Sequence, residues 1–346
     1  MPARILIASP LEAEHVRSIA AAADGTEVAF EPELLPPPRY PCDHRGPPDW
    51  RRDAAAELRW GQLLATAEIL YGIPGDSGAQ LSDALARAPQ VRWVQGTSAG
   101  AGELVRAARL SRELLARVAF TSAAGVHGGM LAEFVFGGIL ALRKHFRALE
   151  RIRAERAWPH FPNGELAGSS IAIVGMGGIG SNVARIARAF EMRAIAVTRT
   201  GERHPDAEDA FPISGIGDAF AAADHVVVTL PGTEQTRGLI SAKVLGRLRR
   251  TAIFCNVGRG SVVDQGALTR ALQRRAIAGA VLDVFEPEPL APDDPLWSLD
   301  NVVLSPHTMA LSVHENERIV ALFCDNLQRF AAGSPLRNLV DTNEFY

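Results

Sequence analysis

The sequence predicts an α/β protein built on parallel sheets, and three observations support this. The chain has 346 residues, and at roughly 150 residues per domain this length favours two domains. Hydrophobic residues make up 47% and charged residues 22%, which excludes a disordered or fibrous chain. From Ser170 onward, short apolar runs alternate with helical stretches, as is typical of a parallel sheet with helices on both faces.

The first third of the chain also alternates between strand-like and helix-like segments. We expect strands at 4–8, 27–30, 68–71 and 91–95, and helices at 12–23 and 53–67. Residues 32–48 hold seven prolines, which excludes an ordinary helix or a central strand because proline lacks the backbone N–H. We interpret this proline-rich segment as a surface loop without a role, and the alternative is a flap near an active site.

The rest of the chain supplies the elements of a second sheet. One long helical region is expected over 126–158, and its apolar stretch Met130–Leu142 is broader than a solvated helix needs. Part of that stretch is expected to pack on another domain or subunit. Strands are then expected at 171–174, 194–197, 225–230, 252–257, 280–284 and 301–304, and a last helix at about 313–332.

A glycine-rich segment fits the pattern G-x-G-x-x-G. The pattern alone is weak, but here it follows a strand-like run and opens a helix with apolar residues at helical spacing, the context that dinucleotide binding requires. Its glycines would allow a tight turn, a close approach to a pyrophosphate and close helix–strand packing, and the helix N-terminus would present N–H groups to the phosphates. A glycine turn without a ligand is the alternative. The predicted cofactor-binding residues of this turn are Gly175, Met176, Gly177, Gly178, Ile179 and Gly180.

The end of the next strand indicates which dinucleotide binds. An acidic residue there would hydrogen-bond the ribose hydroxyls of NAD, but this chain has Thr198, Arg199 and Thr200. A hydroxyl and a guanidinium suit a 2′-phosphate, which a carboxylate would repel. We therefore predict that NADP is the preferred cofactor and that NAD is possible. In the alternative, Arg199 only stacks on the adenine or points to solvent.

Three polar residues follow the last three strand-like runs. They are Arg259, Glu288 and His307, and each would leave the carboxyl end of a strand in one sheet, where open α/β sheets bind ligands. An arginine can form a forked contact with a carboxylate, a histidine can deliver a proton near neutral pH, and a carboxylate beside the histidine would hold its ring and favour the imidazolium. Glu286 is a rival for the role of Glu288. Each residue alone has an ordinary structural explanation, but the combination predicts an acid–base site.

The net charge and the composition limit the kinds of partner and the location that we expect for this protein. The net charge of −3 gives a nucleic acid no general electrostatic attraction, so no nucleic-acid function is expected. Cys42, Cys255 and Cys324 lie far apart and form no CxxC pair or disulfide framework, which favours a cytoplasmic location. The N-terminus resembles a strand rather than a signal peptide, and no apolar stretch is long enough for a membrane span. No metal site is expected.

These motifs, in this order, resemble those of the D-isomer-specific 2-hydroxyacid dehydrogenase family. The matching segments are Gly175–Gly180, Leu230–Ile240, Asn256–Gly260, Asp283–Pro289 and Ser305–His307. The resemblance is strong over 164–307, weaker over 91–133 and the tail, and slight over the proline-rich segment.

The resemblance implies two α/β domains of Rossmann-like and flavodoxin-like topology, with the cofactor domain inserted into the substrate domain. Residues 1–124 and 318–346 would form the substrate-binding domain, and residues 125–317 the dinucleotide-binding domain. Homodimers built on the cofactor domain are usual in this family.

The resemblance also implies an activity, the NAD(P)-dependent reduction of a small 2-keto acid of the glyoxylate or hydroxypyruvate type to the D-2-hydroxy acid. Arg259 would bind the substrate carboxylate and polarise the ketone, His307 would donate the proton, and Glu288 would pair with His307. Further cofactor contacts would come from Leu230, Pro231, Thr236, Val257, Gly258 and Asp283, and further substrate contacts from Tyr71, Gly72, Ala99 and Gly100.

Other functions share some of these features. A dinucleotide-sensing regulatory protein of the corepressor type retains the same three residues and is the non-enzymatic alternative. Phosphite dehydrogenase shares them too, whereas Glu288 argues against formate dehydrogenase. A Rossmann methyltransferase is disfavoured by the order of Arg259, Glu288 and His307.

Overall fold

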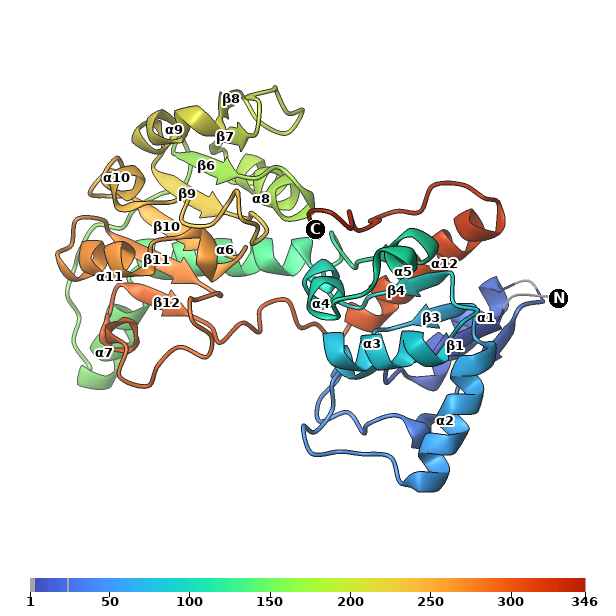
Figure 1. The fold of residues 1–346 in the computed structure, drawn as a ribbon. Helices are drawn as coiled ribbons and strands as arrows, with labels where there is room; N and C mark the ends of the chain where they lie inside the picture. Colours follow the sequence, from blue (N-terminus) through green and yellow to red (C-terminus); the bar gives the residue numbers. More distant parts are fainter. Residues whose placement is uncertain (1–3, 24, 346) are drawn as a thin grey trace. The chain divides into compact units, whose positions relative to one another are not determined.

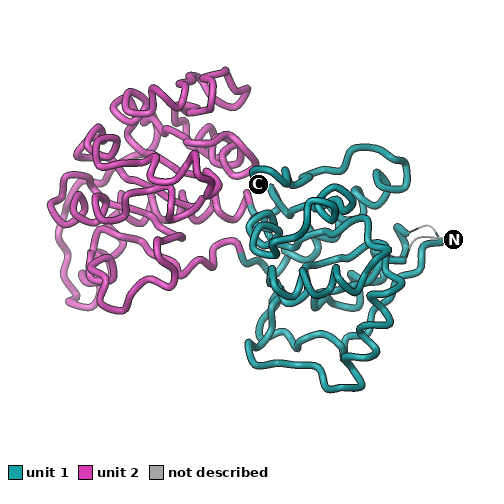
Figure 2. The backbone as a smooth tube through the Cα atoms, viewed as in Figure 1, with its two compact units in different colours: residues 1–127, 311–346 teal, residues 128–310 magenta. Residues whose placement is uncertain are grey.

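The computed structural model describes residues 4–23 and 25–345, and within them the chain forms two compact units (Figure 2). Unit 1 comprises residues 1–127 and 311–346, and unit 2 comprises residues 128–310. The chain passes from unit 1 to unit 2 after His127 and returns after Ala310. These boundaries lie three residues after and seven residues before the expected boundaries at 124 and 317.

Unit 1 contains a five-stranded parallel sheet of order β2-β1-β3-β4-β5. Its strands are β1 (Arg4–Ile7), β2 (Glu27–Ala29), β3 (Ile69–Tyr71), β4 (Trp93–Gln95) and β5 (Ala119–Thr121). Its α-helices are α1 (Ala13–Ala22), α2 (Ala54–Thr66), α3 (Gly78–Arg87), α4 (Ala101–Ala107), α5 (Arg112–Arg117) and α12 (Glu315–Ala331), with short 3₁₀ turns at Pro32–Leu34 and Pro74–Asp76.

Both faces of this sheet are buried. Alternate strand residues point to opposite sides, and each side packs against its own apolar core. Leu6, Leu70 and Val94 face one apolar core with α2, α3 and α4. Ile5 and Trp93 face a second core that includes residues of α1 and α12. A strand buried on both faces has an almost continuously apolar sequence, as Ile5 to Ala8 does.

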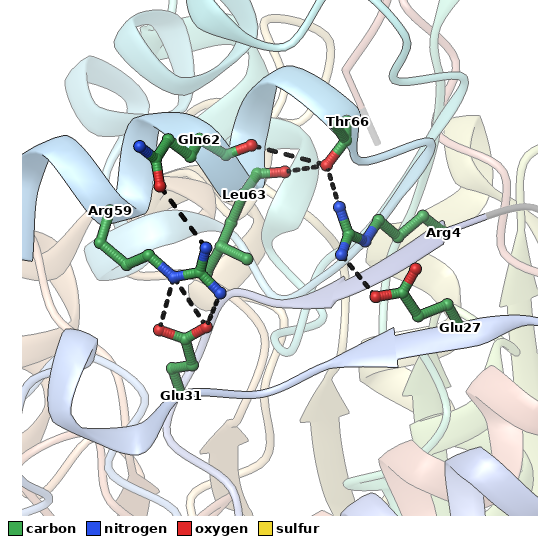
Figure 3. A network of polar contacts seen from close by, with 7 residues as sticks. All are labelled: Arg4, Glu27, Glu31, Arg59, Gln62, Leu63 and Thr66. Carbon is green, nitrogen blue, oxygen red and sulfur yellow. Dashed lines mark hydrogen bonds and ion pairs between the residues drawn. The ribbon is translucent and has the colours of Figure 1, made fainter.

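Polar side chains join the edge of this sheet to α2 (Figure 3). Arg4 of β1 bonds both Glu27 of β2 and Thr66 of α2, and Arg59 of α2 bonds Glu31 just after β2. The Arg59 hydrogen bond lowers the pKa of the Glu31 carboxyl. Because these groups are partly exposed to water, each contact adds at most about 1 kcal/mol to stability.

Unit 2 contains a seven-stranded parallel sheet of order β12-β11-β10-β9-β6-β7-β8 (Figure 1). Its strands are β6 (Ser170–Val174), β7 (Arg193–Thr198), β8 (Asp209–Pro212), β9 (His225–Val228), β10 (Ile253–Asn256), β11 (Gly279–Leu282) and β12 (Val302–Leu304). Its α-helices are α6 (Gly128–Arg143), α7 (Phe146–Glu155), α8 (Gly178–Ala189), α9 (Ile216–Ala222), α10 (Ala242–Leu245) and α11 (Gln265–Gln273), with 3₁₀ turns at Ile213–Gly215, Gly260–Val262 and Pro295–Ser298.

The second sheet is likewise covered on both faces. Residues of α6 and α8 pack on one face, and residues of α9, α10 and α11 pack on the other. Gly138 lets α6 lie close to the sheet, since a Cβ there would come within 2.5 Å of the Val281 side chain. This layered arrangement agrees with the expected α/β class and the parallel sheets.

Two expectations about elements were wrong. The long helix expected over 126–158 is two helices, because His145 takes a left-handed conformation with φ of 56° between α6 and α7. Two strands were missed, β5 and β8. Most large side chains of the apolar stretch Met130–Leu142 pack into the core of unit 2 itself, and the expected contact of the rest with another domain or subunit stays a prediction.

Among residues 4–23 and 25–345, no helix is long and apolar enough to cross a membrane.

Candidate active site

The glycine-rich turn joins β6 to α8. Gly175 has a φ of 99°, which favours glycine, and a Cβ there would lie 2.8 Å from the Thr229 hydroxyl. At Gly180 a Cβ would meet the Gly175 carbonyl oxygen at 2.1 Å, so only glycine lets the helix start this close to the strand. At Gly177 a Cβ would meet nothing within 4 Å, so space is open in front of the first turn of α8.

This turn lies where the strand order reverses. β7 and β8 extend the sheet to one side of β6, whereas β9 to β12 extend it to the other. Ligands of open α/β sheets bind at such a switch point. No side chain caps the N-terminus of α8, so its first N–H groups are available to a phosphate. The open space and the uncapped helix N-terminus fit the pyrophosphate of a dinucleotide.

Thr236 organises the loop after β9. Its hydroxyl donates to the carbonyl oxygen of Pro231 at 2.6 Å and accepts from the Thr233 N–H at 2.9 Å. Leu230 contacts the glycine turn, because a Cβ at Gly175 would lie 3.0 Å from its side chain. The loop therefore borders the predicted cofactor site on its β9 side, and Thr236 supports its shape.

The end of β7 carries Thr198, Arg199 and Thr200. The Thr198 hydroxyl accepts a hydrogen bond from the N–H of Gly201 at 3.0 Å, so it closes a tight turn. Arg199 and Thr200 are exposed. No carboxylate occupies the strand end itself, as the sequence indicates.

The turn after β10 holds Arg259 between two glycines. A Cβ at Gly258 would come within 2.5 Å of the Leu230 carbonyl oxygen, and one at Gly260 within 1.9 Å of the Phe285 carbonyl oxygen. Both positions therefore require glycine for close backbone packing. Buried Asn256 closes the turn, since its amide donates to the Arg259 carbonyl oxygen at 3.0 Å and accepts from the Gly258 N–H at 3.1 Å.

Glu288 and His307 are in direct contact. The Nδ1 atom of His307 lies 2.8 Å from Oε2 of Glu288, and the other carboxylate oxygen of Glu288 accepts from the N–H of Phe285 at 2.9 Å. Both side chains are partly exposed, at 41% for His307 and 36% for Glu288. Glu286 faces elsewhere, 3.9 Å from Arg237. Of the two candidate carboxylates, Glu288 is the one that touches the histidine.

Asp283 fixes the loop that carries the histidine. Its side chain is 1% exposed, and Oδ1 accepts hydrogen bonds from the N–H groups of Thr308 and Met309 at 3.1 and 3.3 Å. His307 itself has a left-handed φ of 56°, a conformation that costs a non-glycine residue energy and persists only where its surroundings hold it. The carboxylate of Asp283 therefore supports the histidine loop, and its expected contact with the cofactor stays a prediction.

Arg259, Glu288 and His307 follow β10, β11 and β12, which are neighbours in the sheet. Neighbouring strands are about 4.8 Å apart, so the three residues leave one short stretch of its carboxyl edge. The close approach of Gly260 to Phe285 further joins the Arg259 turn to the Glu288 turn. A guanidinium, a carboxylate and an imidazole at this edge can bind a carboxylate and transfer a proton.

The predicted substrate contacts Tyr71, Gly72, Ala99 and Gly100 lie in unit 1, at the carboxyl ends of β3 and β4. Tyr71 is fully buried, and its ring packs edge-on against Phe323 with 5.1 Å between the ring centres. Its side chain therefore belongs to the core of unit 1 and presents no surface to a substrate.

Sequence reasoning missed Asn256 altogether, and it predicted Asp283 only as a cofactor contact and not as a support of the histidine loop. Asn256 and Asp283 are both buried side chains directly at the ends of β10 and β11. A buried polar residue at a strand end indicates a fixed turn, because such a group needs hydrogen-bond partners. Asn256, the first residue of Asn-Val-Gly-Arg-Gly, is a polar residue at the end of an apolar run and could have indicated such a turn.

Comparisons with known proteins agree with this geometry. The family model for the D-isomer specific 2-hydroxyacid dehydrogenase, NAD binding domain, matches residues 136–309. A glyoxylate reductase from Aeropyrum pernix is 37% identical over 270 residues, which cover 75% of this chain and 79% of that protein.

Two solved structures have the same fold along the whole chain. A D-isomer specific 2-hydroxyacid dehydrogenase family protein from Aeromonas salmonicida matches with a TM-score of 0.79 and 28% identity over 99% of this chain and 100% of that one. A D-isomer specific 2-hydroxyacid dehydrogenase from Xanthobacter autotrophicus Py2, in complex with NADPH and MES, matches with a TM-score of 0.77 and 26% identity over 100% and 99%. The chain therefore belongs to the D-isomer specific 2-hydroxyacid dehydrogenase family and is an NAD(P)-dependent enzyme of small-molecule substrates.

Proposed function

We propose that this enzyme reduces a small 2-keto acid of the glyoxylate or hydroxypyruvate type to the D-2-hydroxy acid. The observation that carries the proposal is the 2.8 Å contact of His307 with Glu288 on the sheet edge that also bears the glycine turn. The name of the Aeropyrum pernix relative, glyoxylate reductase, supports this choice of substrate.

His307 is the proton donor in this proposal. Its Nδ1 is engaged by Glu288, which leaves Nε2 to protonate the ketone oxygen. When bound, the nicotinamide cofactor supplies the hydride that reduces the carbonyl carbon. The carboxylate orients the ring and stabilises its positive charge before the proton leaves.

Arg259 binds the substrate carboxylate and polarises the neighbouring carbonyl. A guanidinium suits this task because its planar N–H groups match a carboxylate in two parallel hydrogen bonds. Gly72, Ala99 and Gly100 are proposed to contribute backbone contacts to the substrate. Tyr71 is proposed to contribute through its backbone alone, since its ring is buried.

NADPH is proposed as the preferred cofactor. The end of β7 carries two hydroxyls and a positive charge, from Thr198, Arg199 and Thr200. These groups suit a 2′-phosphate, whereas a carboxylate at this position would repel one. The Xanthobacter autotrophicus relative was solved with NADPH, which supports this preference. The other proposed cofactor contacts are Gly175, Met176, Gly177, Gly178, Ile179, Gly180, Leu230, Pro231, Thr236, Val257, Gly258 and Asp283.

A turnover assay tests the activity. The purified enzyme is mixed with NADPH and, in separate reactions, with glyoxylate, hydroxypyruvate and pyruvate, and the loss of NADPH absorbance is followed. His307→Gln should lower turnover by roughly 10²- to 10⁴-fold, the usual contribution of a general acid, and should leave NADPH affinity nearly unchanged. His314→Gln, an exposed histidine of the same chain, is the control and should behave as wild type.

Two results would refute this assignment. One is wild-type turnover in His307→Gln, and the other is no reduction of any 2-keto acid by the folded wild-type enzyme. For the cofactor, Arg199→Ala should weaken NADPH binding while NADH binding stays the same. Equal use of NADPH and NADH by the wild type would contradict the proposed preference.

A homodimer is also proposed. Phe146 and Leu149 of α7 are 51% and 45% exposed, and Trp158 beyond it is 89% exposed. Exposed apolar side chains gathered in one segment are typical of an interface. Light scattering should give twice the chain mass, and Trp158→Asp should shift the equilibrium toward the monomer. A monomeric wild type at micromolar concentration would rule the dimer out.

A further inference from the structure

The C-terminal segment of the chain, red in Figure 1, pairs with the edge of the unit 1 sheet. β5 is an edge strand of that sheet. Leu339 forms an antiparallel bridge with Thr121, and the N–H of Val340 donates to the carbonyl oxygen of Phe120 at 2.8 Å. This pairing covers backbone groups that an edge strand would otherwise expose to another chain.

The same segment is tied to α12. Asn326 of α12 is fully buried, and its amide bonds both backbone groups of Arg337. The oxygen accepts from the Arg337 N–H at 2.7 Å, and Nδ2 donates to the Arg337 carbonyl oxygen at 3.1 Å. Asn338, the next residue, is therefore held on one side by α12 and on the other by the pairing of Leu339 and Val340 with β5.

Asn338 reaches past the end of β5. Its φ of 54° is left-handed, a conformation that asparagine tolerates better than most residues. Its Nδ2 donates to the carbonyl oxygens of Ala124 at 2.7 Å and Ser122 at 3.4 Å, and its own carbonyl oxygen accepts from the Ser122 N–H at 2.9 Å. Because Leu339 and Val340 already pair with the strand, the amide of Asn338 fixes the segment that follows it.

The end of β5 in turn holds the loop that follows β4. The N–H of Ala123 donates to the carbonyl oxygen of Ser98 at 3.0 Å. The N–H of Gly96 donates to the carbonyl oxygen of Thr121 at 2.7 Å. Residues 96–98 are therefore fixed at two points by the backbone that Asn338 and its neighbours hold.

This loop leads directly into Ala99 and Gly100, which are proposed above to contact the substrate through their backbone. From this series of hydrogen bonds we infer that Asn338 is a positioning residue for the substrate. It holds residues 122–124, these residues hold Ser98, and the loop then presents Ala99 and Gly100. The inference rests on the proposed function, because that function gives the loop its contact with the substrate.

The expected effect is on substrate binding. In the proposed reaction the loop meets the substrate carboxylate, which the reduction leaves unchanged. Such a contact is equally strong in the ground state and the transition state, so its loss raises KM and leaves kcat unchanged. A purely structural role would lower the amount of folded enzyme and would not change KM for one substrate alone.

Asn338→Gly tests the inference on the full-length enzyme. Glycine adopts a φ of 54° without strain, so this change removes the amide and keeps the turn. KM for the 2-keto acid that the wild type reduces fastest should rise about tenfold, while kcat and KM for NADPH should stay within about twofold. Asn338→Asp keeps the shape but removes the N–H donors, and it should give the same rise.

Two control variants separate positioning from stability. Leu339→Ala changes the neighbouring side chain, which is exposed, and should behave as wild type. Ile19→Val removes a methylene from a fully buried residue of α1, so it lowers stability without changing the hydrogen bonds of the loop. It should leave KM for the 2-keto acid unchanged. Thermal unfolding shows that each variant is folded and compares the loss of stability.

Two further readouts do not need turnover. Isothermal titration calorimetry measures the Kd of oxamate, an unreactive analogue of a 2-keto acid, for the NADPH complex, and this Kd should rise about tenfold in Asn338→Gly. Hydrogen–deuterium exchange followed by mass spectrometry should show faster exchange of residues 96–101 in Asn338→Gly than in the wild type and in Leu339→Ala.

Several results would overturn the inference. They are unchanged KM and oxamate Kd in folded Asn338→Gly, an equal rise of KM in Ile19→Val, a fall in kcat with KM unchanged, and unchanged exchange of residues 96–101. Loss of folding in both Asn338 variants would also overturn it, because the residue would then serve stability. Failure of the proposed function is distinguishable, since the wild type itself would then neither reduce a 2-keto acid nor bind oxamate, and the inference would fall with it.

Discussion

Replacing Asp283 by alanine should disturb His307, the proposed proton donor, although the two side chains are not in contact through any hydrogen bond described above. The Asp283 carboxylate, 1% exposed, bonds two backbone N–H groups immediately after His307. A hydrogen bond to a charged group contributes about 1.5–3 kcal/mol, so two such bonds set an upper limit of about 3–6 kcal/mol. Because Thr308 and Met309 are only partly buried, water replaces part of the loss. We expect Asp283→Ala to lower the free energy of unfolding by about 2–4 kcal/mol.

The same change should lower turnover. The left-handed conformation of His307 depends on the backbone that Asp283 holds, and a displacement of about 1 Å at a reacting group can cost about 10²-fold in rate. Asp283→Asn keeps Oδ1 as an acceptor for both N–H groups, so it should lose about 1 kcal/mol and retain most of the turnover.

Urea unfolding followed by circular dichroism, together with the NADPH assay, checks both effects. Asp293→Ala, at an exposed position in the loop after Glu288, is the control and should match wild type. The reasoning is refuted if Asp283→Ala unfolds within about 0.5 kcal/mol of wild type, the range of ordinary surface substitutions. It is also refuted if the alanine and asparagine variants lose the same stability and activity.

Three further predictions concern unit 2. Gly260→Ala places a Cβ 1.9 Å from the Phe285 carbonyl oxygen, so it should cost about 1–3 kcal/mol in urea unfolding, and a variant as stable as wild type would contradict the close backbone approach. Burial, followed by a nearby guanidinium, lowers the pKa of His225 to about 4 from an ordinary value of about 6.5. The unfolded chain therefore binds the proton first, and the wild type should lose on the order of 3 kcal/mol as the pH falls from about 6.5 to 4. His225→Gln should lack that loss in urea titrations across this range, and equal pH dependence would show the assignment to be wrong. Glu288→Gln should reduce turnover roughly 10- to 10²-fold, whereas Glu286→Gln should leave it unchanged, and the opposite pattern in the NADPH assay would reassign the histidine partner.

Much of the second sheet could be predicted from sequence because its strands are buried on both faces and therefore have apolar, β-branched runs. β8 was not predicted because Asp209 and Pro212 lie within it, and it is identified as a strand only by its pairing with β7. β5, with the three residues Ala119–Thr121, is too short to produce a periodic pattern. The break between α6 and α7 at His145 had no glycine or proline to mark it.

The candidate site was predictable where residue type and strand position agree. Arg259, Glu288 and His307 all follow predicted strands, and their chemistry is distinctive. The choice between Glu286 and Glu288 needed the path of the loop, which places one carboxylate beside Arg237 and the other beside His307. Tyr71 is the reverse case, since its position in a motif suggested a substrate contact while its burial makes it a core residue.

The split of unit 1 between the two ends of the chain has a consequence for biosynthesis. Phe323 of α12 stacks on Trp93 with 4.9 Å between ring centres, and Tyr71 packs edge-on against the Phe323 ring. During translation the ribosome synthesises residues 128–310, which form the whole of unit 2, before it synthesises α12. Until residues 315–331 emerge, the nascent chain carries an aromatic sheet face in water, the kind of surface that chaperones bind. Translation that stops short of α12 therefore yields a chain in which unit 2 is complete, whereas unit 1 is incomplete and prone to aggregation.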